Sequence, residues 1–504
     1  MNRIAWKRSG TSIDGQEVKN PNRKEGRTRM ITGEEYLERL RRQRDNVYMG
    51  GQIVKRDDPR LMPGVRVVQL TYDLAAKGDY QPLFTATSHL SGEKINRFTH
   101  IHQNPEDLLL KQDMTRAGVQ KTGFCIQRCM GIDSMNALSV VTKEMDEELN
   151  TDYHDRFLAY LKYWQENDIA GCCAQTDSKG HRKLRPHQQA DKDQYLRIVK
   201  RRKDGIVVRG AKIHITMAAQ AHEVLAIPTR MLTSEESDWA VAVAVPADAP
   251  GLYMINRASS PRERKYLSSP LASFGSSDSF IVFDDVFVPW ERVFMGGEQH
   301  FAGRLALLFA NYHRHSYCGC KPAVSDVLMG LAALVAEYNG VSQAQHIQHK
   351  IADLIEVAEL VYAAGVAAAV RSKKASSGTQ IPHVIFANVG RRLAGEKIYH
   401  EHSILTDIAG GLPATLPFEE DFFAEKIGDF LNKYIIRDPT FSSEAHHRCY
   451  RTISDLICSG FGGVWQIAGV HGGGSPIMET IGILSNYDLE IRKKIAKELA
   501  GIKD

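Results

Sequence analysis

The stretch "SFIVFDDVFVPWERVF", residues 279–294, shows how the middle of this chain folds. Its β-branched and aromatic residues form short apolar runs that stop at Asp-Asp and at Pro, which is the pattern of strands and their turns. The stretches "DGIVVRGAKIHIT" (204–216) and "DWAVAVAVPAD" (238–248) have the same character. These runs predict a β domain over residues 168–297.

Helical patterns lie on both sides of this β region. Upstream, Thr32 and Glu35 fit a capping box at the start of a helix, and Gly50 with Gly51 fits its end. Downstream, "SQAQHIQHKIADLIEVAELVYAAGVAAAVRSKK" (342–374) is one long amphipathic run, as in an antiparallel bundle. We therefore predict an α+β fold with four parts: an N-terminal extension (1–30), a helical domain (31–167), the β domain (168–297) and a helical bundle domain (298–504).

The composition of the 504 residues narrows the class of protein. Apolar residues make up 43% and charged residues 25%, and the net charge is only +4, which predicts a globular protein that does not bind nucleic acid. We find no run of eighteen apolar residues and no secretory signal, so we expect no membrane span. Eight cysteines are too few for a disulfide scaffold, which favours a cytoplasmic chain with reduced thiols.

Two distant stretches hold soft metal ligands. "KTGFCIQRCMG" (121–131) contains Cys125 and Cys129, and "NYHRHSYCGCK" (311–321) contains His313 and Cys320, which we expect in a tight Gly-containing turn before a helix. Three thiolates and one imidazole suit an iron–sulfur cluster with one distinct corner, or a structural zinc ion. By spacing alone, the neighbours Cys318 and His315 are equally eligible.

The remaining signals are weaker. Cys172 and Cys173 are adjacent and are expected in the core, and Cys449 and Cys458 are expected to pack inside the bundle. The turn "QTDSKGHR" (175–182) is polar and contains Gly, so it can offer N–H groups and a hydroxyl to a flavin or a phosphate. Ordinary surface-loop chemistry explains that turn equally well.

With these segments in hand, the chain resembles the 4-hydroxybutyryl-CoA dehydratase / vinylacetyl-CoA delta-isomerase family, within the 4-hydroxyphenylacetate 3-hydroxylase superfamily. The resemblance runs from about residue 30 to the end. It is carried by the motifs "INRFTHIHQ", "FCIQRCMGID", "FIVFDDVFVPWERVF", "HRHSYCGCK", "DIAGGL" and "HGGGSP". It implies an acyl-CoA dehydrogenase-like fold, a homotetramer and an acyl-CoA thioester substrate.

The resemblance also implies a [4Fe-4S] cluster and FAD. Carried over position by position, the family's cluster ligands fall on Cys125, Cys129, His313 and Cys320, and its active-site Tyr and Lys fall on Tyr317 and Lys321. Contacts to the flavin cofactor are expected from Thr216, Thr176, Lys179, Arg182 and Gln127. The implied reaction is a radical dehydration of 4-hydroxybutyryl-CoA, or a close acyl-CoA, to crotonyl-CoA, in which His313 is the candidate base at C2.

Two positions depart from the family pattern. Where the family has its first catalytic Glu, this chain has Asp278, which is expected to act as an acid or an orienting carboxylate. Where the family has its second, this chain has Ala468. Several functions therefore stay open: dehydration with a relocated acid, isomerisation of vinylacetyl-CoA, a reaction on another acyl-CoA, a flavin-dependent aromatic monooxygenase, or a non-catalytic homologue.

Overall fold

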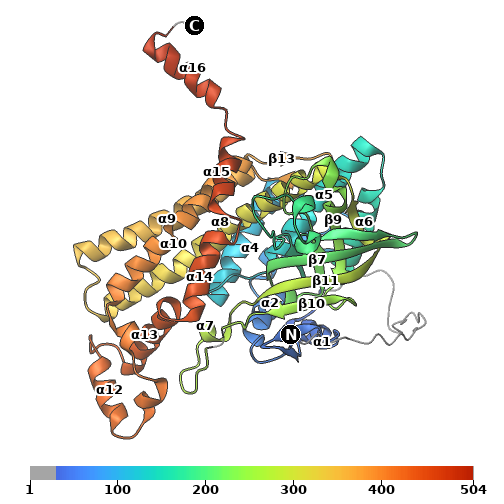
Figure 1. Cartoon of the computed structure of the whole chain (residues 1–504). Coiled ribbons are helices and arrows are strands. Elements are labelled where there is room, and N and C mark those ends of the chain that lie inside the picture. Colours follow the sequence, from blue (N-terminus) through green and yellow to red (C-terminus); the bar gives the residue numbers. More distant parts are fainter. Residues whose placement is uncertain (1–29, 261, 503–504) are drawn as a thin grey trace.

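The computed structural model describes residues 30–260 and 262–502, and it is built from helices at both ends of the chain and strands in the middle (Figure 1). The predicted order of helices, strands and a helical bundle is confirmed. Residues 1–29, which make up nearly all of the predicted N-terminal extension, lie outside the described residues.

The N-terminal helical region begins with a capped helix. In α1 (Gly33–Arg41) the Thr32 side chain accepts from the Glu35 N–H at 3.2 Å and the Glu35 carboxylate accepts from the Thr32 N–H at 2.9 Å, so the predicted capping box is confirmed. The prediction that Gly50 and Gly51 end this helix is wrong. They form the turn of a hairpin, where both have positive φ. The other helices and strands before the main sheets are β1 (Val47–Met49), β2 (Gln52–Val54), α2 (Met62–Ala76), α3 (Gln81–Phe84), β3 (Thr85–Thr87), β4 (Lys94–Asn96), α4 (Pro105–Thr122), α5 (Cys129–Leu149) and α6 (Tyr153–Glu166).

Two sheets fill the middle of the chain. The larger has the strand order β2-β1-β10-β11-β7-β6 and the smaller has the order β12-β9-β8-β5. The strands are β5 (Gly171–Ala174), β6 (Arg197–Arg201), β7 (Gly205–Thr216), β8 (Glu223–Ala226), β9 (Val241–Pro246), β10 (Leu252–Asn256), β11 (Asp278–Pro289) and β12 (Val293–Gly296), with the short helix α7 (Pro270–Ser273) before β11.

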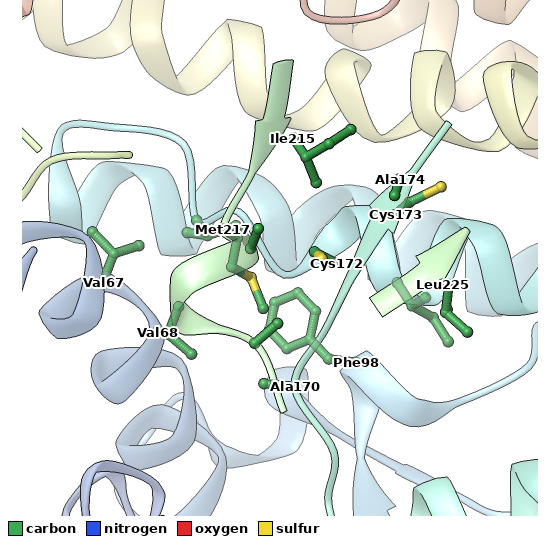
Figure 2. Packing of buried hydrophobic residues seen from close by; sticks show 14 of the residues in the cluster. Val67, Val68, Phe98, Ala170, Cys172, Cys173, Ala174, Ile215, Met217 and Leu225 are labelled. Atoms are coloured by element: carbon green, nitrogen blue, oxygen red, sulfur yellow. The ribbon is translucent and has the colours of Figure 1, made fainter. Parts of the chain in front are cut away.

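Buried apolar side chains join these sheets to the N-terminal helices. Cys172 and Cys173 on β5 lie in this core with Phe98 and Met217, so their predicted place is confirmed (Figure 2). Cys449 is also buried, as predicted, but Cys458 is exposed at the end of its helix, and that prediction is wrong.

The C-terminal half is a bundle around one 40-residue helix, α8 (Gln299–Tyr338). It packs against α4, α9 (Gln345–Val370) and α10 (Val384–Ala409) (Figure 1). By length and hydropathy α8 could cross a membrane, but 61% of its most apolar window is buried inside the structure, as in a core helix. The other elements are β13 (Lys373–Lys374), β14 (Gln380–Ile381), α11 (Leu412–Thr415), α12 (Ile427–Ile435), α13 (Ser443–Ile457), α14 (Gly460–His471), α15 (Pro476–Leu484) and α16 (Leu489–Ala500).

The predicted turn at "SYCGCK" (316–321) is wrong, because these residues lie inside α8. Gly319 is there for close packing: a Cβ on it would lie 2.3 Å from the backbone oxygen of Gln112 on α4. Pro322 lacks the N–H that would bond the Cys318 carbonyl, and the Gln112 side chain donates to that oxygen at 3.1 Å instead. Gly319 therefore lets α4 pack closely on α8, and Pro322 leaves a carbonyl free for a hydrogen bond from α4.

Candidate active site

Four of the predicted site residues lie on one face of α8. Counted from His313, the other three residues, Tyr317, Cys320 and Lys321, follow at four, seven and eight positions. These are helical spacings, so the four side chains leave the same side of the helix. His313, Cys320 and Lys321 are buried. The helix thus presents an imidazole, a phenol, a thiol and an amine together.

The loop before α5 brings two more thiols to this face. Cys125 lies in the loop, and Cys129 is the first residue of α5. The thiols of Cys129 and Cys320 hydrogen-bond to the Cys125 sulfur and lower the pKa of Cys125 well below its ordinary value. The N–H of Gln127 also donates to that sulfur at 3.4 Å, from a backbone with φ of 64°. Three sulfurs from segments nearly two hundred residues apart therefore meet at one point.

His313 completes this group with an oriented imidazole. One ligand atom each of Cys129, Asp133 and His313 lie within 4.8 Å of one another. The Asp133 carboxylate is 3.0 Å from His313 Nδ1, which leaves Nε2 as the nitrogen available to a metal or a proton. Metal-binding histidines in proteins are commonly held by a carboxylate in this way. The donor set of three thiols and one oriented imidazole fits the chemistry of an iron–sulfur or zinc site.

Asp133 itself is held by a buried network. It accepts from Lys111 Nζ at 3.0 Å and from Ser316 Oγ at 2.9 Å. Burial alone would raise the pKa of Asp133, but the Lys111 charge and the hydrogen bond from His313 outweigh burial and hold the pKa below its usual value. The carboxylate is therefore charged and fixed.

Cys318 and His315, which spacing alone could not exclude as metal ligands, face away from this site. The Cys318 thiol donates to the Arg314 carbonyl within its own helix, at 3.4 Å. His315 Nε2 lies 3.2 Å from the carbonyl of Gly365 on α9, and burial lowers the pKa of His315 to about 3. Both side chains belong to the packing between α8 and α9.

Tyr317 lies between the sulfurs and the C-terminal segment. Its ring is edge-on to the His313 ring, with centroids 5.2 Å apart, and its hydroxyl donates to the carbonyl of Ala468 at 3.2 Å. The guanidinium of Arg391 lies over the Tyr317 ring, 4.5 Å from its centroid. A Cβ on Gly472 would stand 1.7 Å from the Tyr317 oxygen, so only glycine allows this approach. Position 468 therefore borders the phenol directly.

Lys321 is paired with a buried carboxylate. Its Nζ donates to Glu401 Oε2 on α10 at 2.5 Å, and Ser325 Oγ donates to the other oxygen of Glu401. Glu401 has no exposed surface. The amine is thus held beside Cys320 by a second buried ion pair.

Asp278 and Thr216 form a separate pair on the sheet. They are cross-strand neighbours on β11 and β7, and the Thr216 hydroxyl donates to Asp278 at 2.6 Å. Arg257 binds the other carboxylate oxygen at 2.8 Å. Gln127 reaches toward this pair from the cysteine loop, since its side chain donates to the Gly275 carbonyl at 3.0 Å, and its own amide oxygen is buried without a hydrogen-bond partner among the described residues.

The turn at 175–182 runs along the same strand as Thr216. The Thr176 carbonyl accepts from the Ile213 N–H on β7 at 2.8 Å. Lys179 is half-buried there, and its pKa is lowered first by burial and then by the charge of Arg182. The Thr216 hydroxyl, bonded to Asp278, lies at one end of this strand, and the cationic turn with Lys179 and Arg182 lies along it. This arrangement fits a flavin ring and its phosphates.

Sequence reasoning missed the residues that hold the site in place, namely Asp133, Lys111, Glu401 and Arg391. Only Asp133 carried a local signal, because it follows Cys129 by four residues on the same face of a helix. The others reach the site from α4 and α10, which no spacing rule links to the cysteines.

Comparisons with known proteins agree along nearly the whole chain. Residues 32–295 match the profile described as 4-hydroxyphenylacetate 3-hydroxylase N terminal, and residues 302–501 match the corresponding C terminal profile. The chain is 40% identical to the 4-hydroxybutyryl-CoA dehydratase/vinylacetyl-CoA-Delta-isomerase of Clostridium aminobutyricum, over 94% of this chain and 100% of that one. An archaeal 4-hydroxybutyryl-CoA dehydratase from N. maritimus superposes with a TM-score of 0.90, at 37% identity, over 94% of this chain and 96% of that one. The FAD complex of the oxygenase component of 4-hydroxyphenylacetate 3-monooxygenase superposes with a TM-score of 0.84, at 26% identity, over 93% and 98% of the two chains.

Proposed function

The chain belongs to the 4-hydroxyphenylacetate 3-hydroxylase family, and we propose that it dehydrates 4-hydroxybutyryl-CoA to crotonyl-CoA and isomerises vinylacetyl-CoA to the same product. The observation that carries this proposal is the meeting of Cys125, Cys129, Cys320 and His313 at one point. The 40% identity to a dehydratase, against 28% to a monooxygenase oxygenase component from Thermus thermophilus, supports it.

The proposal includes a [4Fe-4S] cluster on those four residues and an FAD beside them. Thr216, Thr176, Lys179, Arg182 and Gln127 would hold the flavin. When bound, the flavin would supply reversible one-electron chemistry and the cluster a Lewis acid for the substrate hydroxyl.

The protein's own groups then handle the protons. Asp133 holds Nδ1 of His313, so Nε2 would be the base that removes a proton from C2. Tyr317 and Lys321 lie on the same face and would bind the C4 hydroxyl and return a proton as it leaves as water. Crotonyl-CoA also requires that C3 loses a proton and that C4 gains one, so the two protons taken from C2 and C3 balance the one that leaves in water and the one that C4 receives. Asp278, bonded to Thr216 and Arg257, would orient the substrate or the flavin as a fixed carboxylate.

The loss of the second family Glu shapes this mechanism. Because Tyr317 bonds the backbone of Ala468, a Glu at that position would have its carboxylate near the phenol. Here Glu401 contacts the catalytic face through Lys321, in addition to Asp133, which holds His313. We therefore assign proton return to Tyr317 and to the Lys321–Glu401 pair.

The assembly is also part of the proposal. Large apolar side chains are exposed along the C-terminal helices, and α16 stands away from the rest of the chain (Figure 1). A homotetramer would cover such faces. The exposed residues are Ile427, Phe430 and Tyr434 on α12, Ile477, Ile481 and Leu484 on α15, and Ile491, Ile495 and Leu499 on α16. The free cysteines are consistent with the cytoplasmic location that we propose.

The test is an anaerobic incubation of protein that holds iron, sulfide and flavin, with the CoA esters identified by mass spectrometry. Conversion of 4-hydroxybutyryl-CoA to crotonyl-CoA, a loss of one water, is the expected result. Conversion of vinylacetyl-CoA alone would favour the second candidate, an isomerase that has lost dehydration with the Glu at 468. Loaded protein that converts neither ester would refute both.

A further inference from the structure

An arginine pocket lies at the surface between the β10–β11 loop and α13. It has a volume of about 220 Å³ and is lined by Arg264, Leu267, Ser268, Ser269, Pro270, Arg448, Arg451 and Thr452. A larger cavity of about 560 Å³ lies among residues 85–110, but acidic and basic side chains line it together. The arginine pocket has no carboxylate among its lining residues.

The guanidinium groups of this pocket are fixed but not fully used. Arg448 Nη1 donates to the Ser268 carbonyl at 2.8 Å, and Arg451 Nη2 donates to the Pro417 carbonyl at 2.5 Å. Arg451 Nε is buried without a hydrogen-bond partner among the described residues. The pocket therefore holds at least one positioned N–H donor, on Arg451, that no described residue accepts from.

The carboxylates around the pocket cancel its positive charge only in part. Asp455 is shared between Arg264, at 2.5 Å, and Arg262, at 3.6 Å. Glu444 pairs with Arg448 on the solvent side at 2.7 Å. Glu419 is taken up by the backbone N–H groups of residues 265–267. Of the three arginines that line the pocket, Arg264 and Arg448 each have a carboxylate partner, whereas Arg451 makes no ion pair among the described residues.

The pocket is connected to the candidate active site by a short path. Pro270 begins α7, and the next residue, Leu271, packs on Gly123, where its Cδ1 lies 2.4 Å from the place of a Cβ. Gly123 precedes Cys125 by two residues, at most about 7 Å of extended chain, so one apolar contact and this short stretch link the pocket to the sulfurs. Phe124 and Phe461, with ring centroids 5.2 Å apart, lie beside this path.

We infer that this arginine pocket binds the phosphate groups of the coenzyme A part of the substrate. The inference rests on the proposed function, which requires a CoA thioester. The pantetheine arm of CoA is about as long as five extended residues, roughly 17 Å, so phosphates in the pocket would place the thioester at the sulfurs. Arginine is the side chain best suited to hold phosphate oxygens by paired N–H donors.

The test is calorimetric titration of the holoenzyme with CoA, with pantetheine and with inorganic phosphate. Wild-type protein is expected to bind CoA at least tenfold more tightly than pantetheine. Arg448→Gln and Arg451→Gln should each weaken CoA binding by about tenfold to a hundredfold, the loss of a charge-assisted hydrogen bond, and leave pantetheine unchanged. Arg202→Gln, at an exposed turn far along the β domain, is the matched control and should bind CoA as wild type does.

The inference fails if both variants bind CoA with wild-type affinity, or if wild-type protein binds pantetheine as tightly as CoA. Inorganic phosphate that binds without being displaced by CoA would make the pocket a free-anion site and also overturn the inference. These readouts need no turnover. A protein that binds CoA through these arginines but forms no crotonyl-CoA would refute the proposed reaction and leave the pocket standing.

Discussion

Replacing Asp133 by Asn should destabilise the protein by about 3–5 kcal/mol, the usual cost of breaking a buried ion pair by removing one partner. Asp133 has no exposed surface and receives hydrogen bonds from Lys111, Ser316 and His313 at 2.9–3.0 Å. An Asn side chain keeps one acceptor but turns an N–H₂ group toward donors. It also leaves the Lys111 ammonium, only 1% exposed, without a counter-charge.

The assay is urea unfolding of protein at one fixed concentration, with the shift in midpoint converted at constant slope. Combining Asp133→Asn with Lys111→Met should recover at least 2 kcal/mol relative to the sum of the two single changes, because the unpaired charge is then gone. Asp204→Asn, an exposed member of a surface pair, is the control and should cost less than about 1 kcal/mol.

Asp133→Asn protein within 1 kcal/mol of wild type would refute the reasoning, since it would mean that the buried network has no energetic role. The same variant tests the site. An imidazole released from its carboxylate should hold metal about 10–100-fold more weakly, which iron content after gel filtration would report.

The remaining predictions concern single side chains. Tyr317→Phe should lower kcat with 4-hydroxybutyryl-CoA by about 10²–10⁴-fold, because it removes a proton donor to the leaving C4 hydroxyl. The thermal midpoint should change little, and an unchanged kcat would contradict the role given to the phenol. Ala468→Glu should raise the dehydration rate relative to isomerisation by about tenfold or more, read as the ratio of the two crotonyl-CoA yields, and an unchanged ratio would count against the missing acid. Glu236 is fully buried, which would raise its pKa, but hydrogen bonds from Arg185, the Thr233 N–H and His187 together outweigh burial and lower the pKa of Glu236 to about 2. This carboxylate therefore contributes stability above its unfolded pKa of about 4.3, and the contribution is lost as pH falls through about 2. Glu236→Gln should cost about 3 kcal/mol at pH 7, and urea midpoints should converge with those of wild type between pH 5 and pH 2, whereas a constant gap would contradict the shift.

Local patterns predicted much of this fold because helix caps and strands depend on residues that are close in the sequence. The Thr32–Glu35 capping box and the apolar runs of β7 and β11 were recognisable from adjacent residues alone. The segment around Gly319 was misjudged because a Gly between two Cys usually marks a turn. In the structure that Gly exists so that α4 can approach α8, which is a tertiary reason that no local pattern contains.

The candidate site could likewise be predicted only in part from the sequence. Motif resemblance supplied the thiols, the imidazole, the phenol and the amine, and the structure brings these together on and beside α8. The choice of His313 over His315 could not come from spacing, since it depends on which side of the helix faces α5. The supporting groups Lys111 and Glu401 could not be predicted either, because ordinary surface lysines and glutamates look the same in a sequence.

The single helix that carries four of the site residues limits how this site can change. Each residue added to or removed from α8 between His313 and Lys321 turns everything beyond it by 100°. One such change would swing the thiol and the amine out of phase with the imidazole while leaving the helix itself intact. On α8 the site can therefore change by substitution only, and insertions or deletions that reshape it are expected in the cysteine loop, at residues 123–128.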